Sequence, residues 1–430
     1  MAELTTLTCS GGLRGSVELP PSKSYTHRAV LLASLADGES HIVSPLISRD
    51  TLATVDGCRA FGAELREWHR TLSVRGSRVN LPKDVVNVEN SGTTLRFLTS
   101  VLASTPAGHS VLTGDESVRR RPMQPLLDAL RELGAEAWST RGNGCAPVVV
   151  KGGGIRGGKA RMKGDVSSQF VSSLMISGAL AGGDVTLELS EAVSRPYMDA
   201  TVAAMSRFGI SVERDGYSTF SVPAGKGYKP CEFTVPADMS SASFIGAGVA
   251  LVGGKVAMGK VDQSLPQGDA RIFKILRSMG VEISEGGGQV VVQADGGELE
   301  GGSFDLADTP DLLPVVAVLG LRAKAGVTIS GVRHARFKET DRVAMMAAEL
   351  AKLGAEVEER EDGLTVRPGH PRPAILEAHS DHRLFMAFSL ASLLFARGSA
   401  VAGEDSVDVS YPNFLKDMSS LGAAVGRVAA

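Results

Sequence analysis

The sequence predicts an α/β protein of two lobes, each made of three copies of one repeat unit. Six times along the 430 residues, a helix-like segment ends at an apolar residue, followed by a glycine and then by alternating apolar and polar residues. The spacing of these glycines stays between 68 and 75 residues, and they are Gly62, Gly134, Gly209, Gly280, Gly354 and Gly422. A period this regular indicates an internal repeat.

Each of these glycines predicts the end of a helix and the start of a strand. Glycine just after a helix readily takes the positive φ that ends it, and the alternation that follows is typical of a half-buried strand. Apolar stripes in two of the helices predict core positions, at Leu126, Leu130 and Leu133 and at Val343, Met346 and Leu350. Glycine-rich stretches predict hairpin turns at 75–77, 141–144, 215–216, 286–288 and 362–363.

Six such units divide into two halves of three. Pro223, Pro230 and Pro236 crowd together near the middle of the chain and indicate a break there. Units this long are expected to form two compact lobes rather than a solenoid, with ligands held in a cleft between the lobes.

Composition restricts the class of protein. There are 45 Lys and Arg against 48 Asp and Glu, giving a net charge of −3, and only 5% of residues are aromatic, which argues against nucleic-acid binding. The four cysteines lack the spacing of a disulfide framework or a zinc site. A signal peptide and an apolar run long enough for a membrane span are both missing. We expect a cytoplasmic protein with no metal, no membrane contact and no nucleic-acid partner.

Residues 20–28 are the stretch around which the site is expected to form. Two prolines fix an extended entry, Ser22 or Ser24 is suited to cap the helix that follows, and Lys23 and Arg28 lie on its first turns. A helix N-terminus with these cations and the Ser24 hydroxyl predicts an anion-binding site. The alternative for the stretch alone is a capped surface helix with solvated cations.

Similar polar clusters open other helices, and they carry most of the charge that matters. These clusters are 90–96, 114–123, 165–170, 194–199, 308–314, 334–342 and 380–383. Seven cations are expected to converge, with only Asp311, Glu339 and Asp381 against them: Lys23, Arg28, Arg121, Arg195, Lys338, Arg342 and Arg383. Such a surplus predicts ligands with several negative charges, and phosphate and carboxylate groups are the natural partners.

Taken together, the motifs resemble the enolpyruvyl transferase family, in particular its branch that acts on shikimate 3-phosphate. The resemblance runs from 22–28 through 90–93, 121–123, 167–169, 194–197, 310–311, 338–342 and 381–383 to 411–412. It implies an inside-out α/β barrel in each lobe, built from three βαβαββ units related by pseudo-threefold symmetry. By this resemblance residues 21–237 form the N-terminal lobe, 1–20 plus 238–430 form the C-terminal lobe, and the hinges lie near 20–23 and 236–240.

The activity implied by the resemblance is transfer of the enolpyruvyl group of phosphoenolpyruvate to the 5-hydroxyl of shikimate 3-phosphate. The reaction is an addition followed by an elimination, in the pathway to chorismate and the aromatic amino acids. The resemblance implies no cofactor, two small-molecule substrates and a monomer. Glyphosate mimics phosphoenolpyruvate in this family, and Gly92 predicts an open pocket that it could enter.

The resemblance also assigns residues to roles. The N-terminal lobe would mainly hold shikimate 3-phosphate, and the other lobe would supply phosphoenolpyruvate contacts and catalytic groups. The catalytic candidates are Asp311 as base at the 5-hydroxyl, with Glu339, Lys338 and Lys23. The contacts to shikimate 3-phosphate would come from Lys23, Ser24, Arg28, Ser167, Ser168, Gln169, Ser194, Tyr197, Asp311, His334 and Lys338. Those to phosphoenolpyruvate would come from Lys23, Gly92, Arg121, Gln169, Arg342 and Arg383.

Two alternatives stay open at this point. The branch that uses UDP-N-acetylglucosamine has a cysteine five residues before the Arg-Pro pair, where this chain has Glu116. A non-catalytic anion-binding clamp of the same fold would not need the acid and base groups that this chain keeps. The chain also departs from many relatives, with His334 in place of an Asn and Val409 in place of a Lys. His382 is interpreted as a structural histidine.

Overall fold

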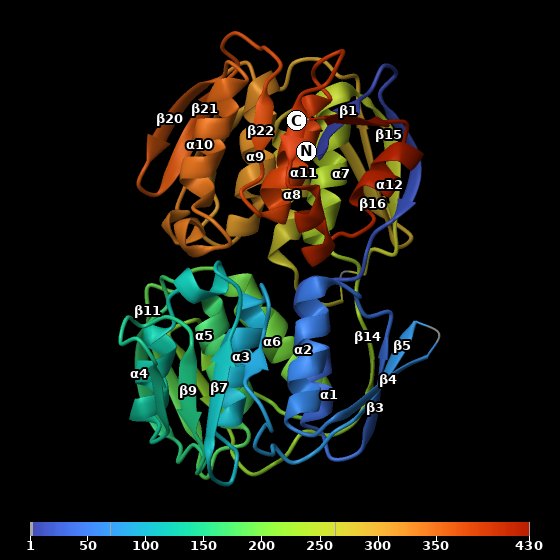
Figure 1. The fold of residues 1–430 in the computed structure, drawn as a ribbon. Coiled ribbons are helices and arrows are strands. Elements are labelled where there is room, and N and C mark those ends of the chain that lie inside the picture. The colour runs from blue at the N-terminus through green and yellow to red at the C-terminus, as the bar shows by residue number, and fades with distance from the viewer. Residues whose placement is uncertain (1–2, 69, 263, 430) are drawn as a thin grey trace. The chain divides into compact units, whose positions relative to one another are not determined.

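The computed structural model describes residues 3–68, 70–262 and 264–429, and it divides into two compact units. The central unit consists of Pro21–Pro236 with Ser264–Pro266. The terminal unit consists of Met1–Pro20, Ala237–Gln263 and Gln267–Ala430, so that it contains both ends of the chain. Figure 1 shows the elements of both units with the labels used below.

The central unit has three four-stranded sheets of one design. In each sheet one edge pair is parallel and the other two pairs are antiparallel. The sheet orders are β14(Glu232–Thr234)-β3(Glu39–Val43)-β5(Thr71–Arg75)-β4(Glu64–Trp68), β6(Val86–Asn87)-β7(His109–Thr113)-β9(Val148–Lys151)-β8(Glu136–Ser139) and β10(Gly158–Lys163)-β11(Val185–Ser190)-β13(Thr219–Val222)-β12(Glu213–Asp215). The helices are α1(Lys23–Ser34), α2(Arg49–Ala60), α3(Gly92–Leu102), α4(Gln124–Glu132), α5(Ser168–Gly178) and α6(Arg195–Arg207), with the short 3₁₀ helix η1(Val118–Arg120).

The terminal unit repeats this design, with two strands supplied by the start of the chain. Its sheet orders are β18(Gly302–Asp305)-β19(Val327–Ser330)-β21(Gly363–Arg367)-β20(Glu356–Arg360), β16(Glu282–Gly286)-β17(Gln289–Ala294)-β15(Gly254–Gly259)-β2(Leu13–Glu18) and β22(Ile375–Glu377)-β23(Ala400–Ala402)-β1(Glu3–Thr8)-β24(Ala424–Ala429). Its helices are α7(Met239–Val252), α8(Arg271–Ser278), α9(Leu313–Leu319), α10(Arg342–Lys352), α11(His382–Ser392) and α12(Phe414–Ser420). Its 3₁₀ helices are η2(Gly268–Ala270), η3(Pro310–Leu312), η4(Gly320–Arg322), η5(Arg333–Phe337) and η6(Glu404–Val409).

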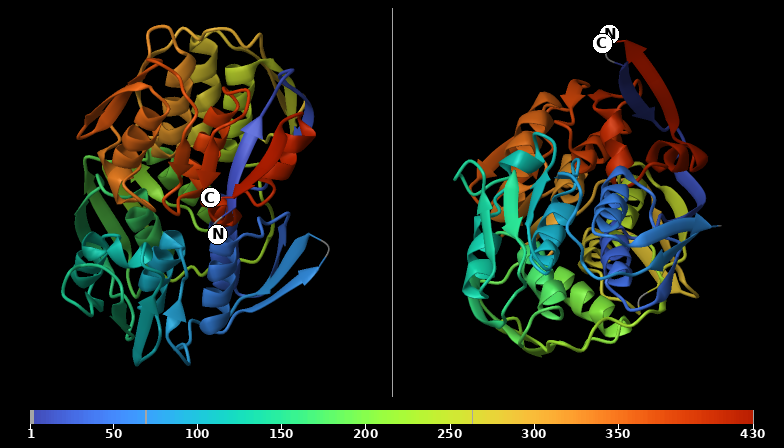
Figure 2. Two further views of the ribbon diagram at one scale, coloured as in Figure 1. Left: turned by 45° about the horizontal axis from the view of Figure 1, so that its top comes forward. Right: turned by 60° about the horizontal axis from the view of Figure 1, so that its bottom comes forward.

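The helices of each unit are of two kinds. Almost every residue is buried in α1, α3 and α5 of the central unit and in α7, α9 and α11 of the terminal unit. Each of these six helices packs against the two middle strands of a sheet and against other helices of its unit. The remaining helices bury only one face, as in α8, where Ile272, Phe273, Ile275 and Leu276 are buried. Each unit is therefore an inside-out α/β barrel, with helices in the core and sheets around it (Figure 2).

The six repeat glycines have the predicted conformation. All six have positive φ, between 83° at Gly134 and 114° at Gly62. A strand starts within four residues of each glycine: β4, β8, β12, β16, β20 and β24. The predicted apolar stripes are also confirmed, because all six of their residues are at most 1% exposed.

The hairpin predictions hold with one exception. Glycine-containing turns join β8 to β9, β12 to β13 and β16 to β17, and the turn that joins β20 to β21 is followed directly by Gly363. The prediction at 75–77 is wrong, because Gly76 follows the end of β5 instead of joining β5 to its partner. A Cβ on Gly76 would lie 2.0 Å from the Ala36 carbonyl oxygen. Glycine is needed there for close backbone approach, not for a turn between strands.

Candidate active site

Helix α1 begins at Lys23, as the two prolines before it predict. Ser22 occupies the N-cap position but makes no side-chain capping hydrogen bond within the described chain, and Ser24 lies inside the helix. The predicted serine cap is therefore wrong. The Ser22 carbonyl instead accepts a hydrogen bond from the Thr26 hydroxyl at 2.9 Å. The start of α1 is thus fixed through the Ser22 backbone, not through its hydroxyl.

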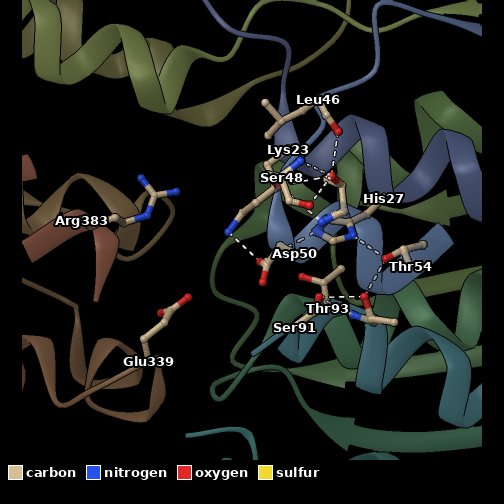
Figure 3. Close-up of polar contacts among 12 residues, drawn as sticks. Lys23, His27, Leu46, Ser48, Asp50, Thr54, Ser91, Thr93, Glu339 and Arg383 are labelled. Carbon is tan, nitrogen blue, oxygen red and sulfur yellow. Dashed lines mark hydrogen bonds and ion pairs between the residues drawn. The ribbon is translucent and has the colours of Figure 1, made fainter. Parts of the chain in front are cut away.

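The Lys23 ammonium pairs with a carboxylate that the sequence did not single out. Lys23 Nζ lies 3.0 Å from Asp50 Oδ2, and His27 Nε2 lies 4.0 Å from the same oxygen (Figure 3). Burial, with Lys23 and Arg28 nearby, holds the pKa of His27 well below its usual range. His27 is therefore neutral at neutral pH, and Lys23 is the cation that pairs with Asp50. Asp50 lies in the first turn of α2, behind a Ser48 capping box, which is the same type of signal as the clusters that were singled out.

A chain of hydroxyl groups connects α1 to the start of α3. His27 Nδ1 lies 2.7 Å from Thr54 Oγ1, which lies 2.6 Å from Thr94 Oγ1. Thr94 Oγ1 in turn lies 2.7 Å from Ser91 Oγ, and Ser91 caps α3 by accepting from the Thr94 amide at 3.2 Å. The network holds the N-terminus of α3 relative to Lys23 on α1.

Gly92, Arg121 and Gln169 lie together at the N-terminus of α3. A Cβ on Gly92 would lie 2.5 Å from Arg121 Nη1 and 3.4 Å from Arg96 Nη1. Gln169 accepts a hydrogen bond from Arg96 at 2.5 Å and donates one to the Thr93 hydroxyl at 2.9 Å. Arg96 and Thr93 belong to the polar cluster at 90–96 but were not assigned a role. A helix start beside two guanidinium groups forms a site suited to an anion.

Arg28 is buried, and protein groups surround its guanidinium. It donates to the Thr201 hydroxyl at 2.8 Å and to the carbonyls of Ser24 and Tyr197 at 2.9 Å each. Its guanidinium carbon also lies 5.5 Å from the centre of the Phe97 ring. Because burial is the largest influence and these hydrogen-bond partners are neutral, the pKa of Arg28 is lowered to about 10. Arg28 links α1 to α6 whether or not it also contacts a ligand.

The serine candidates lie at the starts of α5 and α6. Ser167 caps α5 by accepting from the Gln169 amide at 3.3 Å, and Ser168 is the first residue of that helix. Ser194 precedes α6 with a φ of 55°, in the left-handed region that residues other than glycine seldom adopt. Arg195, counted among the seven cations, lies with its guanidinium carbon 5.5 Å from the centre of the Tyr217 ring.

In the terminal unit the predicted catalytic residues form one ion-pair cluster around Asp311. Asp311 Oδ1 lies 2.9 Å from Arg342 Nη1 and 3.8 Å from Lys338 Nζ, while Oδ2 lies 2.9 Å from Arg383 Nη2. Burial acts to raise the pKa of Asp311, but Arg383, Lys338 and Arg342 together outweigh it, so that its pKa lies well below the usual range. The sequence left the sign of this balance open. In the structure the cations decide it.

Arg342 lies at the centre of that cluster and is 1% exposed. It donates to three carboxylates: to Asp381 Oδ2 at 2.7 Å, to Glu339 Oε2 at 2.7 Å and to Asp311 Oδ1 at 2.9 Å. Although burial acts to lower the pKa of Arg342, these three carboxylates raise it above its ordinary value. Its charge is already balanced by protein carboxylates, in contrast to the unbalanced surplus that the sequence predicted.

The other candidates of the terminal unit surround this cluster. Arg383 lies in the first turn of α11, and its amide donates to the helix-capping Asp381 at 2.9 Å. Lys338 and Glu339 follow η5, which contains His334. Burial lowers the pKa of His334 to about 4, with Lys338 adding to the effect, so the imidazole is neutral at neutral pH. His382 and Val409 are buried.

Among the described residues, no group of three or more His, Cys, Asp or Glu side chains is arranged to hold a metal ion. In the same part of the chain, no helix is both long enough and apolar enough to span a membrane.

The chain is similar to known proteins over nearly its whole length. The family model described as EPSP synthase (3-phosphoshikimate 1-carboxyvinyltransferase) matches residues 7–418. A protein of that name from Methanothermobacter thermautotrophicus is 46% identical over 422 residues, covering 97% of this chain and 98% of its own. The protein of the same name from Methanocaldococcus jannaschii is 41% identical over 421 residues, covering 96% and 97%.

Two solved structures share the fold along the whole chain. An EPSP synthase from Acinetobacter baumannii superposes with a TM-score of 0.81 at 25% identity and covers 100% of both chains. The enolpyruvyl transferase NikO from Streptomyces tendae superposes with a TM-score of 0.79 at 20% identity, covering 100% of this chain and 99% of its own, which shows the shared fold. The two α/β units, with cations at the starts of their core helices, are those of an enolpyruvyl transferase. The chain belongs to the EPSP synthase family.

Proposed function

We propose that the protein transfers the enolpyruvyl group of phosphoenolpyruvate to the 5-hydroxyl of shikimate 3-phosphate and releases phosphate. Membership of the EPSP synthase family over residues 7–418 supports this reaction. The structural observation that carries the proposal is the carboxylate of Asp311, held between Arg342 and Arg383 at 2.9 Å from each and near Lys338. It offers a proton acceptor directly beside groups that bind anions.

The chemistry has two halves. In the addition, the 5-hydroxyl oxygen bonds to C2 of phosphoenolpyruvate, C3 takes up a proton, and the hydroxyl proton passes to a base. In the elimination, the bond from C2 to the phosphate oxygen breaks, C3 loses a proton, and the double bond forms again. Both halves need a proton donor and a proton acceptor, and positioned side chains typically contribute a rate factor of about 10²–10⁴.

We assign the base at the 5-hydroxyl to Asp311. In the ligand-free protein its pKa is lowered by Arg383, Lys338 and Arg342, which makes it a weak proton acceptor. Phosphoenolpyruvate brings a phosphate and a carboxylate, and binding to Arg342 and Arg383 would direct part of their charge away from Asp311. The pKa of Asp311 would then rise, so the base would strengthen when the substrate is bound.

The protons at the methylene carbon are assigned to Glu339, with Lys338 and Lys23 as further catalytic groups. Glu339 Oε2 lies 2.7 Å from Arg342 Nη2, and Lys23 Nζ lies 3.0 Å from Asp50 Oδ2. Each group is thus held by an oppositely charged partner in its own unit. Such pairing restricts the rotamers of both side chains before the substrates bind.

The binding residues are proposed as the resemblance implies. Phosphoenolpyruvate would contact Lys23, Gly92, Arg121, Gln169, Arg342 and Arg383. Shikimate 3-phosphate would contact Lys23, Ser24, Arg28, Ser167, Ser168, Gln169, Ser194, Tyr197, Asp311, His334 and Lys338. We further propose that the protein acts in the cytoplasm as a monomer and uses no cofactor.

The test is a metal-free turnover assay. The protein, treated with EDTA, is mixed with phosphoenolpyruvate and shikimate 3-phosphate, and in parallel with phosphoenolpyruvate and UDP-N-acetylglucosamine. We expect phosphate release in the first mixture alone, with a product heavier than shikimate 3-phosphate by C₃H₂O₂. Turnover only with the nucleotide sugar would assign the chain to the other branch, and binding without turnover would make it a non-catalytic clamp.

A further inference from the structure

We propose that Asp269 and Ser240 act as positioning residues for Arg383, orienting its guanidinium for phosphoenolpyruvate. This inference rests on the proposed function, in which Arg383 contacts that substrate. Neither residue belongs to the polar clusters that the sequence singled out. Both lie in the terminal unit, where the start of α7 meets η2.

Two hydrogen bonds, both donated in the same direction, connect Arg383 to Asp269 through Ser240. Arg383 Nη1 donates to Ser240 Oγ at 2.8 Å, and Ser240 Oγ donates its proton to Asp269 Oδ2. A guanidinium can only donate and a hydroxyl has a single proton. The Ser240 proton must therefore point to Asp269 while its lone pair faces Arg383, and the carboxylate sets this orientation.

Arg383 is thus held on two sides by different groups. Nη1 is held through Ser240, and Nη2 is held by Asp311 at 2.9 Å. Asp311 is the proposed base, and its contact is expected to loosen when substrate binds. The Ser240 and Asp269 side would then keep the guanidinium plane in place.

The backbone around Asp269 is itself fixed. The Gln267 side chain donates to the Ala237 carbonyl at 2.8 Å and accepts from the Met239 amide at 3.2 Å, which ties the residues before η2 to the start of α7. Asp269 is 6% exposed and Ser240 lies in the first turn of α7. Asp269 is therefore buried, and Ser240 is partly buried beside it.

The surroundings of Asp269 bring its pKa close to neutral pH. The pKa of Asp269 is raised to about 6: burial is the largest cause and Asp311 and Asp238 act in the same direction, while Arg383 and the Ser240 hydrogen bond act against it. Below about pH 6 the protonated carboxyl no longer imposes the direction of the Ser240 proton. Orientation of Arg383 should then weaken, and affinity for phosphoenolpyruvate should fall.

The same ionisation has the opposite effect on folding. A carboxyl group whose pKa is higher in the folded state than in the unfolded state disfavours folding at pH values above its folded pKa, and this disadvantage is lost as the pH falls. Asp269→Asn removes that buried charge, and because its amide can donate to Ser240 as well as accept from it, the direction of the Ser240 proton is no longer fixed. A purely structural role predicts a lower thermal midpoint for this variant, and a positioning role predicts an unchanged or higher one at pH 7.5.

The experiment compares steady-state kinetics of Asp269→Asn, Ser240→Ala and Ser240→Thr, with Ser243→Ala as the matched control. Ser243 lies on the same helix, and its hydroxyl donates to the Ser240 carbonyl at 2.5 Å without contacting Arg383. We expect Asp269→Asn and Ser240→Ala to raise KM for phosphoenolpyruvate about tenfold or more, with kcat and KM for shikimate 3-phosphate changing less than about threefold. Ser240→Thr, which keeps the hydroxyl, should restore most of the affinity, and Ser243→Ala should behave as the parent.

The pH profile supplies the second readout. In the parent, kcat/KM for phosphoenolpyruvate should decline below about pH 6, and in Asp269→Asn this dependence should be weaker over the same range. Ionisation of the substrate itself cancels, because both proteins are measured with the same compound. Parent-like KM values and pH profile in Asp269→Asn would overturn the inference, as would equal rises in both KM values with a lowered thermal midpoint. If the parent protein itself showed no turnover, that result would instead count against the proposed function.

Discussion

Arg28 of the central unit and Arg342 of the terminal unit are buried to the same degree, at 2% and 1% exposed, yet their surroundings differ in kind. Arg28 donates to hydroxyl and carbonyl oxygens, and its pKa is lowered to about 10. Arg342 donates to three carboxylates, and its pKa is raised. Burial alone therefore does not decide whether the pKa of an arginine is raised or lowered. The charge of its hydrogen-bond partners decides the direction.

This difference extends to each cluster as a whole. In the central unit Lys23, Arg28, Arg96 and Arg121 are held mostly by neutral groups, with Asp50 paired to Lys23. In the terminal unit Lys338, Arg342 and Arg383 are matched by Asp311, Glu339 and Asp381. The central cluster keeps a positive charge that an anionic ligand can balance. The terminal cluster pairs its cations with carboxylates that can also exchange protons.

The largest effect should follow from removing the proposed base. Asp311→Asn keeps an oxygen for Arg342 or Arg383 but removes the charge, and we expect kcat to fall roughly 10²–10⁴-fold with a smaller change in either KM. Phosphate release under saturating substrates measures it. A variant that turns over as fast as the parent would show that Asp311 is not the base.

The next effect concerns stability and compares the two arginines directly. Arg342→Met would remove the cation shared by the buried Asp381 and the partly buried Glu339 and Asp311, of which Asp311 keeps Arg383, and should cost about 3–5 kcal/mol of unfolding free energy at pH 7.5. Arg28→Met leaves neutral oxygens, and we expect a loss of about 1–3 kcal/mol. Urea unfolding of both variants measures the difference.

The pH dependence of these two losses should also differ. In the parent, the lowered pKa of Asp311 gives stability that is present above its unfolded pKa and is lost as the pH falls through its folded value. Without Arg342 the Asp311 pKa is higher, so the deficit of Arg342→Met should shrink as the pH falls from about 5 towards and below the ordinary aspartate value of 3.8. The deficit of Arg28→Met should stay nearly constant. If the loss of unfolding free energy changed with pH in the same way in both variants, the proposed difference between the two clusters would be wrong.

A smaller effect is expected at the anion site of the central unit. The methyl group of Gly92→Ala would lie 2.5 Å from Arg121 Nη1, at the flexible end of a side chain that can move at little cost in folding. We expect KM for phosphoenolpyruvate to rise about tenfold, with a smaller change for shikimate 3-phosphate and an almost unchanged thermal midpoint. Equal changes for both substrates would place Gly92 outside the phosphoenolpyruvate site.

The smallest effect is expected at His334. Burial, with Lys338 beside it, lowers its pKa to about 4, so it carries no charge between pH 6 and pH 8. His334→Asn should keep kcat within about threefold of the parent and leave the shape of the pH profile over that range unchanged. A profile that loses a limb in this variant would show that His334 titrates during turnover and belongs to the proton chemistry.

The sequence predicted the repeat well, because its signals are local. A glycine after a helix and the alternation that follows it need only neighbouring residues, and all six glycines have positive φ. Gly76 was misassigned because its requirement comes from the distant Ala36 carbonyl. Close backbone approach between segments far apart in sequence leaves no local pattern.

The site shows the same limit. Lys23, Gly92, Arg342 and Arg383 could be singled out because they stand at the starts of apolar helices. Their partners were missed where the pairing is tertiary: Asp50 is 27 residues from Lys23, and Ser240 is 143 residues from Arg383. The sign of the Asp311 pKa shift also needed distances, because burial and three cations act on it in opposite directions.

β1 and β2 come from the start of the chain but pair with strands from its later part, so the terminal unit can finish folding only late in synthesis on the ribosome. β1 lies between β23 and β24, and Glu3 pairs with Ala429. At roughly 5–20 residues per second, synthesis of the chain between these strands takes roughly 20–80 s. Through that interval β1, with Leu4 and Leu7 as its apolar residues, is an unpaired strand that other strand edges can pair with. The central unit is made almost entirely from one continuous stretch of chain, so it can finish folding while β1 is still unpaired.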